Sequence, residues 1–161
     1  MIPTDDAVSR EIVMRLAAAA LIGFMLGVDR DLHRKPAGIR VLSLVSIGAC
    51  SVTMLGWLVV SKAAAPVDFI SHIVQGILQG IGFLGAGVIM HLNGNTEVHG
   101  ITTAASIWLC AILGMCCGMG EWFLSVTTFV AAWLILLVGG MIERSILQRK
   151  HGNSQRHGDV D

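Results

Sequence analysis

One stretch of the sequence, residues 73–92, constrains the fold more than any other. It reads IVQGILQGIGFLGAGVIMHL and contains no Lys, Arg, Asp or Glu. A helix that spans the hydrocarbon core of a bilayer needs about 20 predominantly apolar residues, so the length predicts a membrane span. Glycines four residues apart share one helix face and let a neighbouring backbone come close. We therefore predict that this span is packed against protein. Its helix-contact residues are then Gly76, Gly80, Gly82, Gly85 and Gly87.

The composition agrees with a membrane protein. Of the 161 residues, 54% are hydrophobic and 14% are charged, whereas soluble domains have about 25% charged residues. Eleven basic and eleven acidic residues cancel, so no overall positive field favours nucleic-acid binding. The N-terminal residues lack the basic region of a cleavable signal peptide, and we expect the first apolar segment to remain as a membrane anchor.

Five apolar segments follow one another along the chain, and each can cross the bilayer. They lie at about 11–28, 41–62, 73–92, 101–119 and 122–142. The first contains Gly23 and Gly27, a second pair of helix-contact glycines at four-residue spacing. Only Gly120 and Glu121 separate the last two segments, which predicts an antiparallel hairpin. The expected fold class is an all-α integral membrane protein with about five transmembrane helices and a glycine-rich third span.

The basic residues predict how these spans are oriented. Four Lys or Arg residues lie between the first two segments, four follow residue 143, and three lie on the other side of the membrane. By the positive-inside rule, the first loop and the tail are cytoplasmic and the N-terminus is periplasmic. We expect residues 1–143 to form the membrane domain and residues 144–161 to form a basic, then polar, disordered cytoplasmic tail.

A polar cluster is predicted where the helices meet the cytoplasm. Asp29 stands at the end of an apolar helix, where a carboxylate is costly unless it is paired. Arg30, Arg40 or a polar group of another span could be its partner. Pro36 and Gly38 turn the chain sharply, which would place Arg40 against the start of the second span. The alternative is a charged cap that stops the span and binds anionic headgroups. The predicted cluster comprises Asp29, Arg30, Asp31, Arg40, Asn93, His99, Thr102 and Thr103.

Patterns for catalysis and metal binding are missing from the sequence. It has no GxSxG or HExxH motif and no pair of carboxylates spaced for acid–base work. His91 and His99 are loosely spaced and lack a third strong ligand, and nothing in the spacing of the nearby carboxylates demands magnesium. We expect no enzyme activity, no catalytic residue, no metal site and no cofactor.

The polar residues inside the spans leave two interpretations open. No charged residue lies at the centre of a span, where coupled transporters usually have one. Gln75 and Gln79 share one face of the third span. They could form hydrogen bonds across helices, which we favour, or line a narrow polar vestibule.

Four ordered blocks of the sequence resemble the MgtC/SapB family of bacterial inner-membrane proteins. They are GFMLGVDRD at 23–31, KPAGIR at 35–40, GIGFLGAGVI at 80–89 and GITTAASIW at 100–108. Two positions differ from the usual pattern of the family. Asp29 stands where a Glu is usual, and His99 replaces an Arg, which would make that site sensitive to pH. Longer members append a soluble, ACT-like cytoplasmic domain, for which we expect no room here.

The resemblance implies a regulator of adaptation to low magnesium and of ion homeostasis, associated with virulence in pathogens. Such proteins are described as acting on membrane partners, including the F-type ATP synthase, and not as magnesium carriers. The rival hypothesis is a small transporter or channel for Mg²⁺ or another cation. The expected partners are the lipid bilayer and other membrane proteins, without nucleic acid, and the sequence leaves a homodimer open.

Overall fold

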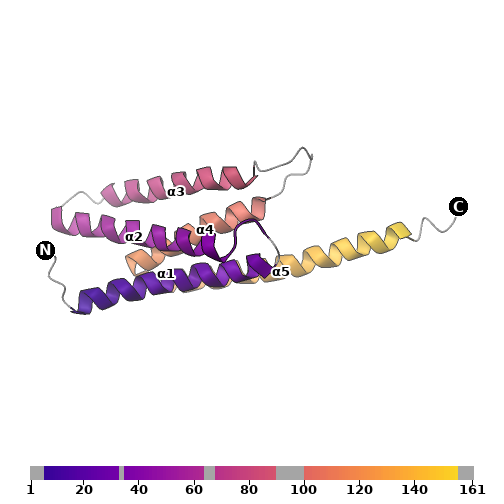
Figure 1. The fold of residues 1–161 in the computed structure, drawn as a ribbon, viewed down its shortest axis with the longest axis horizontal. Coiled ribbons are helices and arrows are strands. Elements are labelled where there is room, and N and C mark those ends of the chain that lie inside the picture. The colour runs from indigo at the N-terminus through magenta and orange to yellow at the C-terminus, as the bar shows by residue number, and fades with distance from the viewer. Residues whose placement is uncertain (1–5, 33–34, 64–67, 90–99, 156–161) are drawn as a thin grey trace. The chain divides into compact units, whose positions relative to one another are not determined.

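Helices make up almost all of the chain that the structure describes. The computed structural model describes residues 6–32, 35–63, 68–89 and 100–155, with the backbone alone for 63 and 140–155. Within them lie α1 (Asp6–Leu32), α2 (Ile39–Ala63), α3 (Asp68–Ile89), α4 (Ile101–Met119) and α5 (Trp122–Gln155) (Figure 1). Each contains a stretch long and apolar enough to cross a membrane. The predicted class, an all-α multi-pass membrane protein, is confirmed.

The helix ends show where local sequence decides a boundary. α4 has the predicted bounds, since Gly120 adopts the left-handed conformation (φ 80°) and ends the helix. The N–H groups of Gly120 and Glu121 donate to the Cys117 and Cys116 carbonyls at 3.1 and 3.0 Å. α1 and α3 begin before the predicted segments, each with an aspartate in its first turn, where a negative charge favours the helix dipole.

The predicted disordered tail is wrong for residues 144–155. There α5 continues as a helix to Gln155. The run from 141 to 150 has no glycine or proline and contains Met, Glu, Arg, Leu, Gln and Lys, which are good helix formers. Residues 156–161 lie outside the described part of the chain.

Glycines bring α1, α2 and α4 into close contact. An ideal Cβ at Gly23 would lie 2.6 Å from the Cα of Ser43, and one at Gly27 would collide with the backbone of Ile39. The predicted contact role of Gly23 and Gly27 is confirmed. On α4, Gly114 lies against the Ser46 carbonyl, and a Cβ at Gly118 would lie 2.7 Å from the Cys50 carbonyl oxygen. α2 is therefore packed between two helices that both approach it through glycine.

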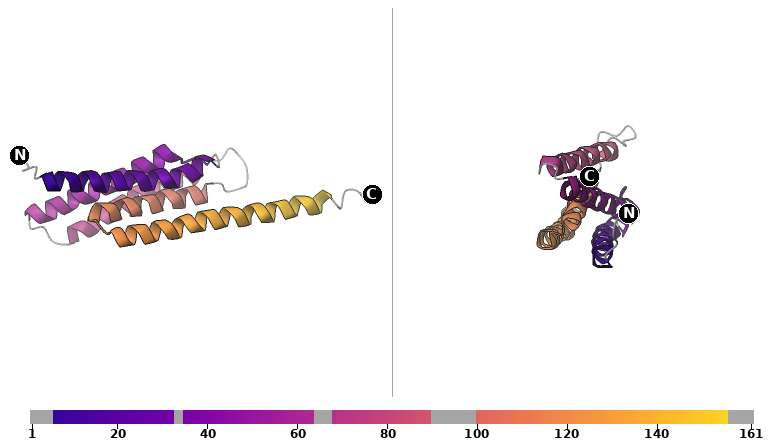
Figure 2. Two further views of the ribbon diagram at one scale, coloured as in Figure 1. Left: turned by 90° about the horizontal axis from the view of Figure 1, so that it is seen from below. Right: turned by 90° about the vertical axis from the view of Figure 1, so that its left-hand side faces the viewer.

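α3 packs by a different kind of contact. Its aliphatic side chains at 74, 77, 78 and 81 lie against a buried cluster of Ala49, Ala111 and Met115 from α2 and α4. Gly85 is buried, and a Cβ there would lie 3.5 Å from the Ala104 methyl group, an ordinary van der Waals distance. α3 and α1 lie on opposite sides of α2 (Figures 1 and 2).

The other glycines of α3 make no contact with another helix among the described residues, so their packing against protein stays a prediction. Among the described residues, no atom comes within 4 Å of an ideal Cβ at Gly76, Gly80, Gly82 or Gly87. Of the five glycines of α3 predicted to be helix contacts, Gly85 alone contacts another helix in the part of the chain that the structure describes. The reason is the helical period: the aliphatic residues occupy the side toward α2 and α4, which turns these four glycines away.

The chain divides into two compact units, Met1–Ser125 and Val126–Asp161. The first contains α1 to α4 and the first residues of α5. The second is the remainder of α5. The two-residue connection after α4 is as predicted, and the packing of α4 against α5 as a hairpin remains a prediction.

Candidate functional site

The most unusual side chain in the first unit is that of Arg30, near the end of α1. It is 2% exposed, and a charge inside a membrane helix needs polar partners. Its guanidinium donates one hydrogen bond to Ser106 Oγ at 3.1 Å and another to Thr103 Oγ1. We call these three residues the Arg30 cluster. It joins the end of α1 to the first turns of α4.

The local sequence places both hydroxyl groups toward α1. Thr103 and Ser106 are three residues apart and therefore share one face of α4. Ser106 Oγ also donates to the Thr102 carbonyl at 2.8 Å, so it both accepts and donates a hydrogen bond. α4 starts after Gly100 (φ 91°), where a Cβ would lie 2.9 Å from the Val88 carbonyl oxygen. Glycine at this position lets the start of α4 lie close to the end of α3.

Two aspartates flank Arg30 and have different roles. Asp29 is half-buried and places a negative charge next to that of Arg30. Asp31 Oδ2 accepts a hydrogen bond from the Ile39 N–H at 3.0 Å. That N–H is in the first turn of α2, so Asp31 caps α2. A Cβ on Gly38 would overlap the Asp31 carboxylate, which explains the glycine in the KPAGIR block.

The structure brings together only part of the predicted polar cluster. Arg30 and Thr103 meet, with Asp29 beside them. Arg40 is exposed and has no hydrogen bond or ion pair among the described residues, so its predicted return toward Asp29 is wrong. The Thr102 side chain is also exposed, and only its carbonyl takes part. Arg40 and Thr102 lie on the outer sides of their helices. Asn93 and His99 lie outside the described residues.

Sequence reasoning missed Ser106, although a signal was present. The run ITTAAS puts hydroxyl groups at 103 and 106, on one helix face. Assigning these hydroxyl groups as acceptors for Arg30 requires knowing that α1 and α4 are neighbours, and the sequence does not give that contact.

A second arginine, in the first half of α1, bonds to the other end of α4. Arg15 donates to the Gly118 carbonyl at 2.5 Å and pairs with Glu11. Gly118 is in the last turn of α4, where carbonyls lack partners within the helix and a positive charge is favourable. Arg15 is one of the three basic residues predicted to lie on the periplasmic side. Its position inside the apolar segment 11–28 was the signal that it needs a polar partner.

The spacing of these contacts sets the register of α1 and α4. Arg15 and Arg30 are 15 residues apart, and so are their partners Gly118 and Thr103. Fifteen residues of helix rise about 22 Å. The two arginines therefore bind an antiparallel partner of matching length near both of its ends, and neither is left facing lipid alone.

The described residues contain no group of three or more His, Cys, Asp or Glu side chains that could hold a metal ion. Their four cysteines are buried and form no disulfide. At Arg30, both terminal nitrogens of the guanidinium donate to hydroxyl groups of α4, while the buried Nε has no partner among the described residues. This arrangement suits the holding of helices together better than proton transfer or nucleophilic attack.

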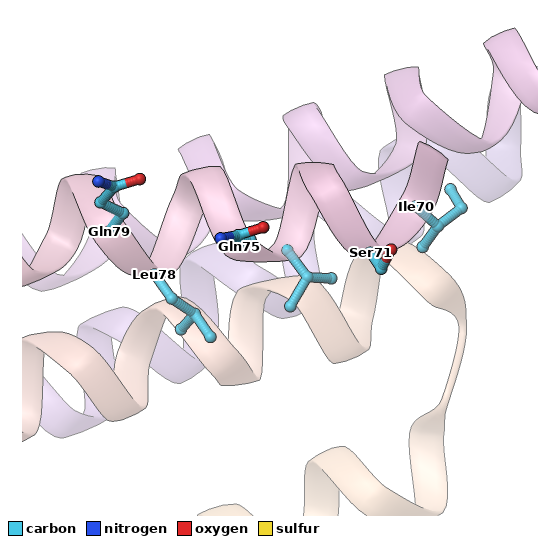
Figure 3. Close-up of a pocket in the computed structure, with 6 residues that line it drawn as sticks. Ile70, Ser71, Gln75, Leu78 and Gln79 are labelled. Carbon is cyan, nitrogen blue, oxygen red and sulfur yellow. The ribbon is translucent and has the colours of Figure 1, made fainter. Parts of the chain in front are cut away.

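A shallow groove runs along α3 on the other side of the unit. It has a volume of about 810 Å³ and is lined by Ile70, Ser71, Val74, Gln75, Leu78 and Gln79. In Figure 3, Leu78 points from α3 toward α4, and Gln79 points away from it. Neither glutamine has a hydrogen bond to any described residue. The predicted bonds across helices are therefore not found among the described residues.

Comparisons with known proteins agree with these features. A family model described as the MgtC family matches residues 16–145. The chain is 37% identical over 115 residues to Protein SrpB of Synechococcus elongatus, which covers 67% of the chain and 63% of the relative. It is 35% identical over 137 residues to Protein MgtC of Salmonella typhimurium, covering 85% of the chain and 54% of the relative. Protein SapB of Bacillus subtilis is 29% identical over 144 residues, 80% of the chain and 60% of the relative.

The chain thus spans between 54% and 63% of the length of these three relatives. No solved structure matches it.

Proposed function

The chain belongs to the MgtC family of multi-pass membrane proteins, and from this premise we propose that it regulates ion homeostasis by binding other membrane proteins. The regulated process is adaptation to low magnesium, associated with virulence in pathogens. The protein acts without catalysis in the bacterial inner membrane, with its N-terminus in the periplasm and its tail in the cytoplasm. The F-type ATP synthase is its proposed partner.

The family match over residues 16–145 carries this proposal. The matched region includes the glycine contacts of α1 with α2 and the whole Arg30 cluster. The relatives are longer, and what they share with this chain is the helical region. A regulator that consists of this helical region contacts its partner proteins through the surfaces of its helices in the membrane.

The environment of Arg30 supports a regulator over the rival hypothesis, a cation transporter or channel. A path for Mg²⁺ would be lined by water, carbonyls or carboxylates. Near the end of α1 the described chain instead has a buried guanidinium held by two hydroxyl groups. Its positive charge opposes the passage of a cation beside it.

Growth of a deletion strain at limiting magnesium tests the proposal. The full chain should restore growth, the Arg30→Met variant should not, and the matched Arg40→Met variant should, because Arg40 is exposed at the same end without a described partner. Purified protein in liposomes with an Mg²⁺-sensitive dye should give no flux above that of empty liposomes. Saturable Mg²⁺ uptake would establish the rival transporter.

Photo-crosslinking in the same strain tests the proposed mode of action. A photoreactive amino acid at Leu44, which is 71% exposed on α2, should capture ATP synthase subunits, identified by mass spectrometry. The same amino acid at Leu113, which is 0% exposed, is the matched control and should capture none. Capture of other membrane proteins alone would remove the ATP synthase from the proposal.

A further inference from the structure

The outward side of α3 is left uncovered by the other described residues of the first unit. At 100° per residue, positions 75, 76, 79, 80, 83 and 87 lie on one side of the helix. They are Gln75, Gly76, Gln79, Gly80, Phe83 and Gly87, and all six are exposed. We call them the Gln/Gly face. The aliphatic side chains of α3 lie on the other side, toward α2 and α4.

This distribution is the reverse of what lipid favours. Gln79 is the twelfth of the 22 residues of α3, so its amide lies near the middle of the span. Moving an amide from water into hydrocarbon without a hydrogen bond costs about 4–8 kcal/mol. Gly76 and Gly80 next to it offer acyl chains no side chain to pack against. The Gln/Gly face therefore fits a protein surface that supplies hydrogen-bond partners.

We propose that the Gln/Gly face pairs with the same face of a second copy of this chain, about a twofold axis along the membrane normal. Copies inserted in the same orientation are related by such an axis, which places each residue opposite its own copy. A glutamine amide is both donor and acceptor, so Gln79 can bond to Gln79 of the other copy. The chemistry of this face is self-complementary, which argues for a second copy over an unrelated partner.

The glycines make this pairing geometrically feasible. Gly76 and Gly80 are one turn apart and have open space above them, so a second α3 can approach closely. A close approach is what brings two glutamine side chains within hydrogen-bonding distance. The groove beside Gln75 and Gln79 receives side chains of the other helix. The inference does not depend on the proposed function, because pairing is measured without a growth phenotype.

Cysteine cross-linking of the full chain in native membranes tests the pairing. Gln79→Cys and Gln75→Cys should each form a disulfide-linked dimer on oxidation with copper phenanthroline. The parent chain, with its four buried cysteines, sets the background. Leu21→Cys is the matched control, because Leu21 is 59% exposed and lies near the middle of α1. It should give no dimer above background.

Three results would overturn the pairing: no dimer at either glutamine position, an equal yield at Leu21→Cys, or a cross-link at Gln79→Cys only to a different protein. A second variant separates pairing from folding. Gly80→Leu, added to Gln79→Cys, fills space that is open in the single chain and should lower the dimer yield about tenfold. An unchanged dimer yield in that variant would also contradict the proposal.

Discussion

Two regions of the molecule contain glycine pairs at the same spacing in opposite environments. One region is the interface of α1 and α4 with α2, and the other is the outward side of α3. Gly23 with Gly27 and Gly114 with Gly118 are glycine pairs at four-residue spacing, and so is Gly76 with Gly80. The first two pairs lie against the backbone of α2, whereas the third has open space above it. The spacing therefore indicates a surface suited to close approach. It does not say whether the neighbour belongs to the same chain.

The polar residues of the two regions differ in the same way. Arg30 and Arg15 are bonded to hydroxyl and carbonyl groups of α4. Gln75 and Gln79 have no hydrogen bond within the described chain. The arginines of α1 thus have polar partners on α4 within one molecule, whereas the two glutamines of α3 have none among the described residues.

The largest effect should come from filling the glycine contacts of the core. Gly114→Leu places a side chain against the Ser46 carbonyl, and overpacking of this kind costs about 3 kcal/mol. Gly80→Leu fills open space and should leave the stability of the single chain within about 0.5 kcal/mol. Unfolding by SDS in mixed micelles, at dilutions where the protein is monomeric, measures both.

Gly114→Ala gives a milder version of the same test if the leucine variant does not fold. Its Cβ still collides with the Ser46 carbonyl, so it should be less stable than the wild type. Equal loss of stability at Gly114 and Gly80 would abolish the distinction between the two regions.

An intermediate effect is expected from the Arg30 cluster. Arg30→Met keeps an apolar side chain of similar length and removes two hydrogen bonds to a charged group. Such bonds contribute about 1.5–3 kcal/mol each, and the loss is reduced because the charge no longer has to be buried. We expect a net loss of about 2 kcal/mol.

The matched control is Arg40→Met, which should change stability by less than about 0.5 kcal/mol because Arg40 is exposed. Both variants are measured in the same SDS titration. If the two arginine variants lost equal stability, Arg30 would not be a structural link between α1 and α4.

The smallest effect on the single chain should come from Gln79→Leu. The amide has no described partner, so its removal breaks no bond within the chain, and stability should change by less than about 0.5 kcal/mol. The same variant should lower dimer formation, measured by energy transfer between labelled copies in liposomes. A large loss of monomer stability would show that Gln79 has a partner inside the chain.

Much of the fold could be predicted from the sequence. The five apolar segments predicted five spans, and the predicted bounds of 101–119 agree with α4, which has a left-handed glycine, Gly100 or Gly120, at each end. The extension of α5 to Gln155 was missed, since polar composition was taken to indicate disorder. This segment is polar, as predicted, but its residues favour a helix, and that preference determines the backbone conformation.

The candidate site was predictable only in part. Arg30 and Thr103 could be singled out as polar residues near one end of their segments. Their contact, and that with Ser106, depends on α1 and α4 being antiparallel neighbours in one register. Asp31 was assigned to the same cluster, and it instead caps α2. The contacts of Arg30 join residues that are far apart in the sequence. The cap that Asp31 forms depends on the geometry of a turn, which the composition does not predict.

The sequence alone determined which segments are helices and the family to which they belong, because apolar length, glycine conformations and motif order are properties of neighbouring residues. Only the tertiary structure decided which face of each helix meets another helix. That choice depends on the rotation of each helix about its own axis, which is set by how its side chains pack against the others. For this reason identical glycine spacings became an internal contact in α1 and α4 and an open surface in α3.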